Sequence, residues 1–210
     1  MSLLNDKTII YLITNGSADD SNFTETFPVI LELIRTAVAE EISLIQIREK
    51  RLCGRLLCEL TLDAAAITKG SKTKLLINDR ADIALACGAH GVHLTTTSLP
   101  AAVIRASIPA GFIVGISTHT LAEAVDAERS GADFAVFGPV FATPDKGEAV
   151  GLSALAEVCE KLRPFPVIGL GGIDGANCDS VISAGASGTA TIRSMSDARG
   201  IRLIAEKLRR

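Results

Sequence analysis

The sequence repeats one unit eight times: a short apolar run, a polar turn, and a longer stretch with apolar residues spaced three and four apart. Short runs rich in β-branched residues are typical of strands, and the longer spacing is typical of amphipathic helices. The expected strands are Ile9–Thr14, Leu44–Arg48, Leu75–Asn78, Gly91–Thr95, Phe112–Ser117, Phe134–Gly138, Val167–Gly171 and Thr189–Arg193. The expected helices are Thr26–Glu40, Arg55–Thr68, Arg80–Cys87, Leu99–Ala106, Leu121–Arg129, Ser153–Leu162, Ala176–Ser183 and Ala198–Leu208.

Most of these strands are nearly continuous apolar runs, as in a parallel sheet covered by helices on its faces. Eight strand and helix units in 210 residues leave about 26 residues for each. The sequence therefore predicts an α/β fold, a single (β/α)₈ TIM barrel that forms one domain over residues 1–210. An open doubly wound sheet is the alternative, but Thr14-Asn15-Gly16-Ser17 stands where that fold carries its GxGxxG fingerprint.

Three of the expected helices end at a glycine, namely Gly88, Gly131 and Gly185. Glycine readily takes the left-handed conformation that closes a helix before the next strand begins. We expect each of these glycines to have a positive φ angle.

Composition excludes several classes of protein. The chain is 48% apolar with a net charge of −3, which excludes a disordered chain and disfavours a nucleic-acid partner. Its apolar runs are too short to span a membrane, and its five cysteines lack metal-ligand spacing. We expect a cytoplasmic protein with reduced thiols and no membrane association, and the sequence leaves a homodimer open.

Polar side chains follow the second expected strand, in the run Gln46 to Lys50. A barrel carries its functional side chains at the carboxyl ends of its strands. Strand alternation places Gln46, Arg48 and Lys50 on one side, where an amide and two cations can receive phosphate or diphosphate. A solvated charge run is the other interpretation of this segment.

The third and fourth strands carry an amide, a carboxylate and an imidazole. Asn78 and Asp79 stand just before a helix expected to begin at Arg80. Asp79 is either the N-cap of that helix or a ligand of Mg²⁺, which favours one or two carboxylates together with phosphate oxygens. His93 is a candidate substrate-binding residue, although an isolated strand histidine is more often a packed and hydrogen-bonded core residue.

The fifth and sixth strands are followed by hydroxyls, an imidazole and a cation. Ser117 and His119 are candidates for hydrogen bonding or proton transfer at the barrel mouth, and simple helix capping is the alternative. A long loop after the sixth strand contains Thr143 and Lys146. Long loops in compact barrels tend to be functional.

The seventh strand ends in Gly171-Gly172, and the eighth ends in Ile192 and Arg193. Loops after the last two strands form the recurrent phosphate site of these barrels, through backbone N–H groups and the start of the following helix. A tight turn is the alternative for the paired glycines.

Seven motifs in order carry a family resemblance, each at a strand end. They are Tyr11-Leu12-Ile13-Thr14, Gln46-Ile47-Arg48-Glu49-Lys50, Ile77-Asn78-Asp79-Arg80, Gly91-Val92-His93-Leu94, Gly115-Ile116-Ser117-Thr118-His119, Gly138-Pro139-Val140-Phe141 with Thr143 and Lys146, and Gly171-Gly172-Ile173. Through them the chain resembles the thiamine phosphate synthase family, which includes the thiazole tautomerases.

The resemblance implies an enzyme that joins hydroxymethylpyrimidine diphosphate to hydroxyethylthiazole phosphate and releases pyrophosphate. It implies that five residues hold the diphosphate: Arg48, Lys50, Asn78, Ser117 and Lys146. By the same resemblance, Asp79 binds Mg²⁺, Gln46 contacts the pyrimidine, and Thr143 and Gly171-Gly172 meet the thiazole phosphate.

The chain departs from the family pattern at two positions. Ser98 stands where the family carries a second Mg²⁺-binding aspartate, so Mg²⁺ binding is expected to be weakened or lost. Arg193 stands where a small serine is usual, and it either adds a cation to the phosphate site or fills the site.

Loss of a metal carboxylate suits a thiazole tautomerase, which only moves protons and would use His119 as its acid and base. The retained Arg48, Lys50, Asp79 and Lys146 favour the synthase. A ligand-binding paralogue without catalytic activity is the remaining alternative.

Overall fold

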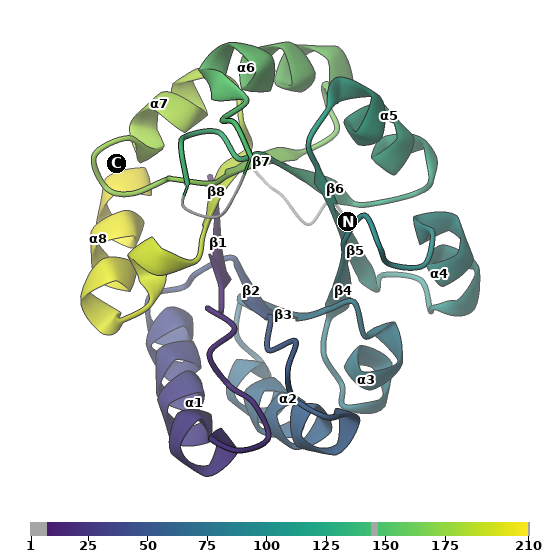
Figure 1. Ribbon diagram of the computed structural model, residues 1–210, viewed down its shortest axis with the longest axis vertical. Coiled ribbons are helices and arrows are strands. Elements are labelled where there is room, and N and C mark those ends of the chain that lie inside the picture. Colours follow the sequence, from purple (N-terminus) through teal and green to yellow (C-terminus); the bar gives the residue numbers. More distant parts are fainter. Residues whose placement is uncertain (1–7, 144–146, 210) are drawn as a thin grey trace.

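The computed structural model describes residues 8–143 and 147–209. Eight parallel strands close into a barrel in sequence order, with β1 pairing to both β2 and β8. The helices lie around the outside of the strands (Figure 1). This arrangement confirms the predicted (β/α)₈ TIM barrel.

The strands agree with the predicted ones to within one or two residues. They are β1 (Ile9–Ile13), β2 (Leu44–Ile47), β3 (Lys74–Asn78), β4 (Gly91–Leu94), β5 (Ile113–Thr118), β6 (Phe134–Phe137), β7 (Val167–Leu170) and β8 (Gly188–Thr191). The helices are α1 (Phe23–Ala39), α2 (Gly54–Thr68), α3 (Ala81–Ala86), α4 (Ala101–Ser107), α5 (Leu121–Arg129), α6 (Gly151–Leu162), α7 (Cys178–Ser183), α8 (Ala198–Leu208) and the short 3₁₀ helix η1 (Arg193–Met195).

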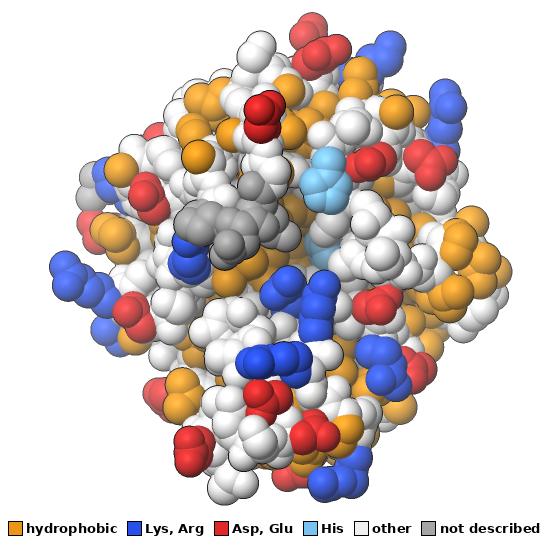
Figure 2. Space-filling model, viewed as in Figure 1, with side chains coloured by type: hydrophobic (Ala, Val, Ile, Leu, Met, Phe, Trp, Pro, Cys, Tyr) orange, Lys and Arg blue, Asp and Glu red, His pale blue; other side chains and the backbone are white. Residues whose placement is uncertain are grey.

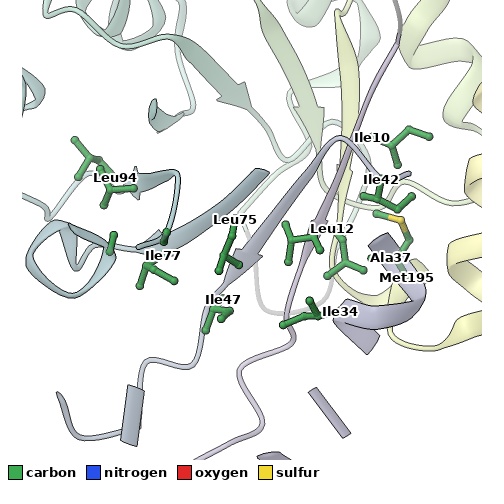
Figure 3. Close-up of a cluster of buried hydrophobic side chains, with 14 of the residues drawn as sticks. Ile10, Leu12, Ile34, Ala37, Ile42, Ile47, Leu75, Ile77, Leu94 and Met195 are labelled. Atoms are coloured by element: carbon green, nitrogen blue, oxygen red, sulfur yellow. The ribbon is translucent and has the colours of Figure 1, made fainter. Parts of the chain in front are cut away.

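Alternation along the strands divides the buried side chains into two groups. Ile9, Tyr11 and Ile13 of β1 belong to a cluster inside the barrel. Ile10 and Leu12 of the same strand belong to a second cluster between strands and helices (Figure 3). Both faces of each strand are therefore covered, as the continuous apolar runs predicted.

Several predicted helix boundaries were wrong. The first helix begins at Phe23, three residues before the expected start, and continues through Pro28. The fourth begins at Ala101 because the chain before it is a turn closed by Ser98. Strand β8 ends at Thr191, so Arg193 begins a 3₁₀ helix instead of ending a strand.

The predicted helix-closing glycines are confirmed. Gly88, Gly131 and Gly185 have φ angles of +74°, +85° and +95°. The five cysteines are free thiols. Over residues 8–143 and 147–209, no helix is both long and apolar enough to cross a membrane.

Candidate active site at the barrel mouth

Two adjacent cavities open at the carboxyl ends of the strands. Their volumes are about 350 and 570 Å³, within the range of small-molecule sites. Of the predicted residues, the first cavity is lined by Gln46, Arg48, Lys50, Asn78, His93, Ser117, His119 and Ile192, and the second by Arg48, Thr143, Gly171, Gly172, Ile192 and Arg193. Arg48, Leu170 and Ile192 line both cavities, so the cavities adjoin.

The end of β2 is fixed by hydrogen bonds to the loop after β1. The backbone N–H of Arg48 donates to Thr14 Oγ1 at 2.8 Å. Glu49 points the opposite way, is buried, and accepts hydrogen bonds from the N–H groups of Gly16 (3.1 Å) and Ala18 (2.8 Å). The predicted alternation is thus borne out, with Arg48 and Lys50 at the cavity and Glu49 acting as an anchor that sequence reasoning did not identify.

Basic side chains gather near the middle of the face shown in Figure 2, beside histidine side chains. Among the described residues, the guanidinium of Arg48 forms no ion pair. Its charge is therefore available to an anionic ligand.

Gln46 is 1% exposed and lies at the floor of the first cavity. Within the described part of the chain, its Nε2 atom has no hydrogen-bond partner. Buried amides in folded proteins are nearly always hydrogen-bonded, so this group is placed to donate to a ligand acceptor.

His93 connects the barrel interior to the first cavity. Its Nδ1 lies 3.0 Å from Tyr11 Oη, and its Nε2 lies 2.9 Å from Ser117 Oγ. Burial, with the nearby Arg48 guanidinium as a second cause, lowers the pKa of His93 to about 3. The imidazole is therefore neutral at physiological pH, and it is at once a packed core residue and part of the cavity wall.

Asp79 is not an N-cap, and the expected start of its helix at Arg80 was wrong. Helix α3 begins at Ala81, and its N-cap residue Arg80 makes no side-chain capping bond. Asp79 takes a left-handed φ of +62° and is exposed, which leaves its carboxylate outside the helix end. It borders a smaller cavity of about 340 Å³ with Lys50, Asn78 and Thr97.

The Ser98 hydroxyl is hydrogen-bonded within the turn that it closes. Its Oγ accepts a hydrogen bond from the N–H of Thr95 at 2.7 Å and lies 3.1 Å from Thr95 Oγ1. In the described ranges, no group of three or more His, Cys, Asp or Glu side chains is arranged to hold a metal ion. Asp79 alone, with substrate phosphate oxygens and water, matches a Mg²⁺ donor set, so these residues fit Mg²⁺ only when it arrives with a diphosphate.

The paired glycines hold the loop after β6 against the end of β7. Gly171 and Gly172 have φ angles of +104° and +63°. The N–H of Phe141 donates to Gly171 O at 3.0 Å, and a Cβ on Gly172 would lie 2.7 Å from the Phe141 Cβ. Only glycine therefore allows this close approach, which places Thr143 at the second cavity.

Arg193 is exposed at the edge of the second cavity, where the described residues provide it with no ion pair. It therefore adds a cation to this cavity. Contrary to expectation, the start of α8 is not among the residues that line the cavity, and its first turn is capped by Asp197, which accepts from the Gly200 N–H at 2.8 Å. Instead of α8, the first residues of η1, Arg193 and Ser194, line the cavity.

His119 is exposed and lies at the rim of the first cavity, with its Nδ1 3.3 Å from Glu123 Oε2. Capping of the next helix is performed by Thr120, whose hydroxyl accepts from the Glu123 N–H. Lys146 lies outside the described residues.

The chain is similar to known proteins over most of its length. The profile of the family described as Thiamine monophosphate synthase matches residues 10–195. The thiamine-phosphate synthase of Methanoculleus marisnigri is 39% identical over 181 residues, which cover 85% of each chain. That of Moorella thermoacetica is 39% identical over 182 residues, which cover 85% of this chain and 86% of the relative.

A solved structure is similar over nearly the whole chain. Thiamine phosphate pyrophosphorylase from Pyrococcus furiosus superposes with a TM-score of 0.82 at 30% identity, covering 97% of this chain and 95% of the other. The family match and these relatives together show that this chain belongs to the thiamine monophosphate synthase family.

Proposed function

We propose that this protein is a thiamine-phosphate synthase, a transferase that couples hydroxymethylpyrimidine diphosphate to hydroxyethylthiazole phosphate. The observation that carries the proposal is the pair of adjoining cavities that share Arg48. The reaction needs two phosphorylated substrates side by side, with the diphosphate between cations. The family match and the relatives named thiamine-phosphate synthase support the same conclusion.

In this reaction the bond between the pyrimidine methylene carbon and the diphosphate oxygen breaks. Pyrophosphate leaves with the electron pair, and the thiazole nitrogen donates its lone pair to the methylene carbon. The pyrimidine ring stabilises the cationic carbon, so catalysis needs stabilisation of the leaving anion more than it needs a base.

The first cavity provides that stabilisation. Arg48 and Lys50 supply positive charge, Arg48 in a fork that matches phosphate oxygens, and Asn78 and Ser117 supply hydrogen-bond donors. Lys146 is proposed to join them from the β6–α6 loop. The unpartnered Gln46 amide is proposed to orient the pyrimidine, which the buried position of this side chain favours.

The second cavity is proposed to hold the thiazole phosphate. Thr143, Gly171 and Gly172 provide a hydroxyl and backbone donors, and Ile192 forms part of the wall against which the ring can pack. Arg193 adds a cation to this phosphate site.

Enzymes of this family use Mg²⁺. When bound, Mg²⁺ neutralises charge on the departing diphosphate. In this chain Asp79 would hold it together with diphosphate oxygens, since the Ser98 hydroxyl is engaged in its turn.

The test is to incubate the purified protein with both substrates and Mg²⁺ and to measure pyrophosphate and thiamine phosphate together. Equal amounts of the two products support the proposal. Absence of thiamine phosphate even in excess Mg²⁺ contradicts it.

One observation favours a second candidate, thiazole tautomerase. The imidazole of His119 lies at the cavity rim beside the carboxylate of Glu123, as an acid and base would. Proton movement on the thiazole would need neither Mg²⁺ nor diphosphate. The test is conversion of a thiazole carboxylate phosphate tautomer, followed by NMR, in the absence of any pyrimidine substrate.

A further inference from the structure

Tyr11 and Ser117 lie on different strands of the barrel and are connected through one imidazole. Tyr11 is on β1 and His93 is on β4, so their side chains meet across the interior of the barrel. The Tyr11 hydroxyl contacts His93 Nδ1 at 3.0 Å, and His93 Nε2 contacts Ser117 Oγ at 2.9 Å.

The burial of Tyr11 determines which atom carries the proton in each of these two hydrogen bonds. Tyr11 is fully buried, and burial raises the pKa of its hydroxyl well above the usual value, so the hydroxyl keeps its proton. Among the described residues, His93 Nδ1 is the one hydrogen-bond partner of Tyr11 Oη. If Nδ1 carried a proton, the Tyr11 O–H would be a buried donor without an acceptor, which is costly.

Tyr11 therefore donates to Nδ1, which must be unprotonated. An imidazole whose Nδ1 is unprotonated carries its proton on Nε2, which donates to Ser117 Oγ. In the described part of the chain, His93 is also the one partner of Ser117 Oγ. The Ser117 hydroxyl proton is then left to point into the first cavity, toward a ligand acceptor.

We propose that Tyr11 is a positioning residue that fixes His93 in its Nε2–H form and so makes the Ser117 hydroxyl a hydrogen-bond donor to the anionic group bound in the first cavity. The role of that anion rests on the proposed function, whereas the direction of the hydrogen bonds does not. Without the phenol, the Nε2–H tautomer leaves Nδ1 without a hydrogen-bond donor, and the Nδ1–H tautomer leaves that N–H group without an acceptor. His93 would then lose its preference, and the Ser117 hydroxyl could turn back to donate to Nε2.

The first measurement is the tautomer itself. In a ¹⁵N-labelled protein, two-bond proton–nitrogen NMR spectra distinguish protonated from unprotonated imidazole nitrogens. The chain has three histidines, so the variants His90→Gln and His119→Gln assign the signal of His93 by elimination. His90 is an internal reference, because its Nδ1 accepts the Leu75 N–H at 3.1 Å and must be unprotonated.

We expect wild-type His93 to be protonated on Nε2 alone, and Tyr11→Phe to show a mixture of tautomers or the Nδ1–H form. A wild-type His93 protonated on Nδ1 would overturn the proposal. This result does not depend on whether the protein makes thiamine phosphate, so failure of the proposed function is distinguished from failure of this inference.

The second measurement is a double-mutant cycle on the binding of inorganic pyrophosphate, measured by calorimetry. Ser117→Ala removes a donor to a charged group and is expected to weaken binding about 10-fold to 100-fold. Tyr11→Phe should weaken it at least about threefold, and the double variant should match Ser117→Ala within about twofold.

Additive losses would contradict the proposal, because they would mean that Tyr11 acts through the packing of the barrel and not through Ser117. Thr61→Val is the matched control, since it removes a buried α2 hydroxyl whose one partner among the described residues is Leu57 O, and Thr61 lines neither of the two main cavities. It should leave pyrophosphate binding unchanged.

Discussion

Glu49 Oε2 accepts a hydrogen bond from the backbone N–H of Ala18 at 2.8 Å, and its Oε1 accepts one from Gly16 at 3.1 Å. The two bonds tie the loop after β1 to the segment of chain that carries Arg48 and Lys50. Because Glu49 is 2% exposed, any acceptor lost there leaves a buried N–H group without a partner.

We expect Glu49→Gln, which keeps one acceptor oxygen, to lower the free energy of unfolding by about 1–3 kcal/mol. Urea denaturation followed by circular dichroism measures this. Glu59→Gln, at an exposed position on α2, should change the free energy of unfolding by less than about 0.5 kcal/mol. Equal changes in the free energy of unfolding for Glu49→Gln and Glu59→Gln would show that the Glu49 hydrogen bonds do not stabilise the fold.

The barrel could be predicted from the sequence because its determinants are local. Continuous apolar runs specify strands buried on both faces, and alternation after β2 correctly separated Arg48 and Lys50 from Glu49. A parallel barrel brings all strand ends to one mouth, so residues chosen at strand ends necessarily gather there.

What escaped prediction depends on distant contacts. Tyr11 and His93 are 82 residues apart, and their meeting depends on how the strands are staggered around the barrel. The N-cap alternative for Asp79 and the helix start at Arg80 were wrong because the capping rule considers residue type, whereas a left-handed residue at position 79 delays the helix to Ala81. The engagement of Ser98 with Thr95 likewise depends on the turn geometry and not on residue type alone.

Substitution of Arg48 by lysine tests the site that the two cavities share. Lysine keeps the positive charge but cannot present two parallel N–H groups to phosphate oxygens. We expect Arg48→Lys to lower the rate of thiamine phosphate formation about 10²-fold at saturating substrates, comparable to the loss of one preorganised donor. Arg55→Lys, exposed on α2, serves as the control, and a rate for Arg48→Lys within threefold of wild type would remove Arg48 from the mechanism.

Protonation of His93 makes stability depend on pH. The pKa of His93 in the folded protein, about 3, lies below the usual 6.5. As pH falls below about 6.5, His93 therefore becomes protonated in the unfolded chain while it stays neutral in the folded chain. The free energy of unfolding should therefore decrease by about 1.4 kcal/mol per pH unit through this one group, down to about pH 3.

Urea titrations of wild type and His93→Asn at pH 7 and pH 5 isolate this contribution. Wild type should lose about 2 kcal/mol more than the variant between the two pH values. The pKa of His90 is also lowered by burial, but His90 is common to both proteins and cancels in the difference. Identical pH slopes would mean that His93 is protonated in the folded protein.

Replacement of His119 tests the tautomerase alternative. If the imidazole beside Glu123 transfers protons on a thiazole, His119→Ala should lower tautomerisation by about 10²–10⁴-fold, the usual contribution of a positioned acid or base. Glu123→Gln, which weakens the orientation of the ring, should have a smaller effect. Full tautomerase activity in His119→Ala would eliminate this mechanism.

Restoring a carboxylate at position 98 tests how Mg²⁺ is held. An aspartate there can still accept the Thr95 N–H with one oxygen, as Ser98 does now, so we expect the turn to persist. Its second oxygen would add a hard anionic ligand near the Asp79 cavity, which Thr95 also lines. In a synthase, Ser98→Asp should therefore lower the Mg²⁺ concentration for half-maximal rate about threefold to tenfold, with a smaller change in the rate at saturating Mg²⁺.

Thr24→Asp, an exposed substitution in the first turn of α1, controls for the added charge. Mg²⁺ dependence that is identical in wild type, Ser98→Asp and Thr24→Asp would show that the metal is held without this part of the barrel mouth.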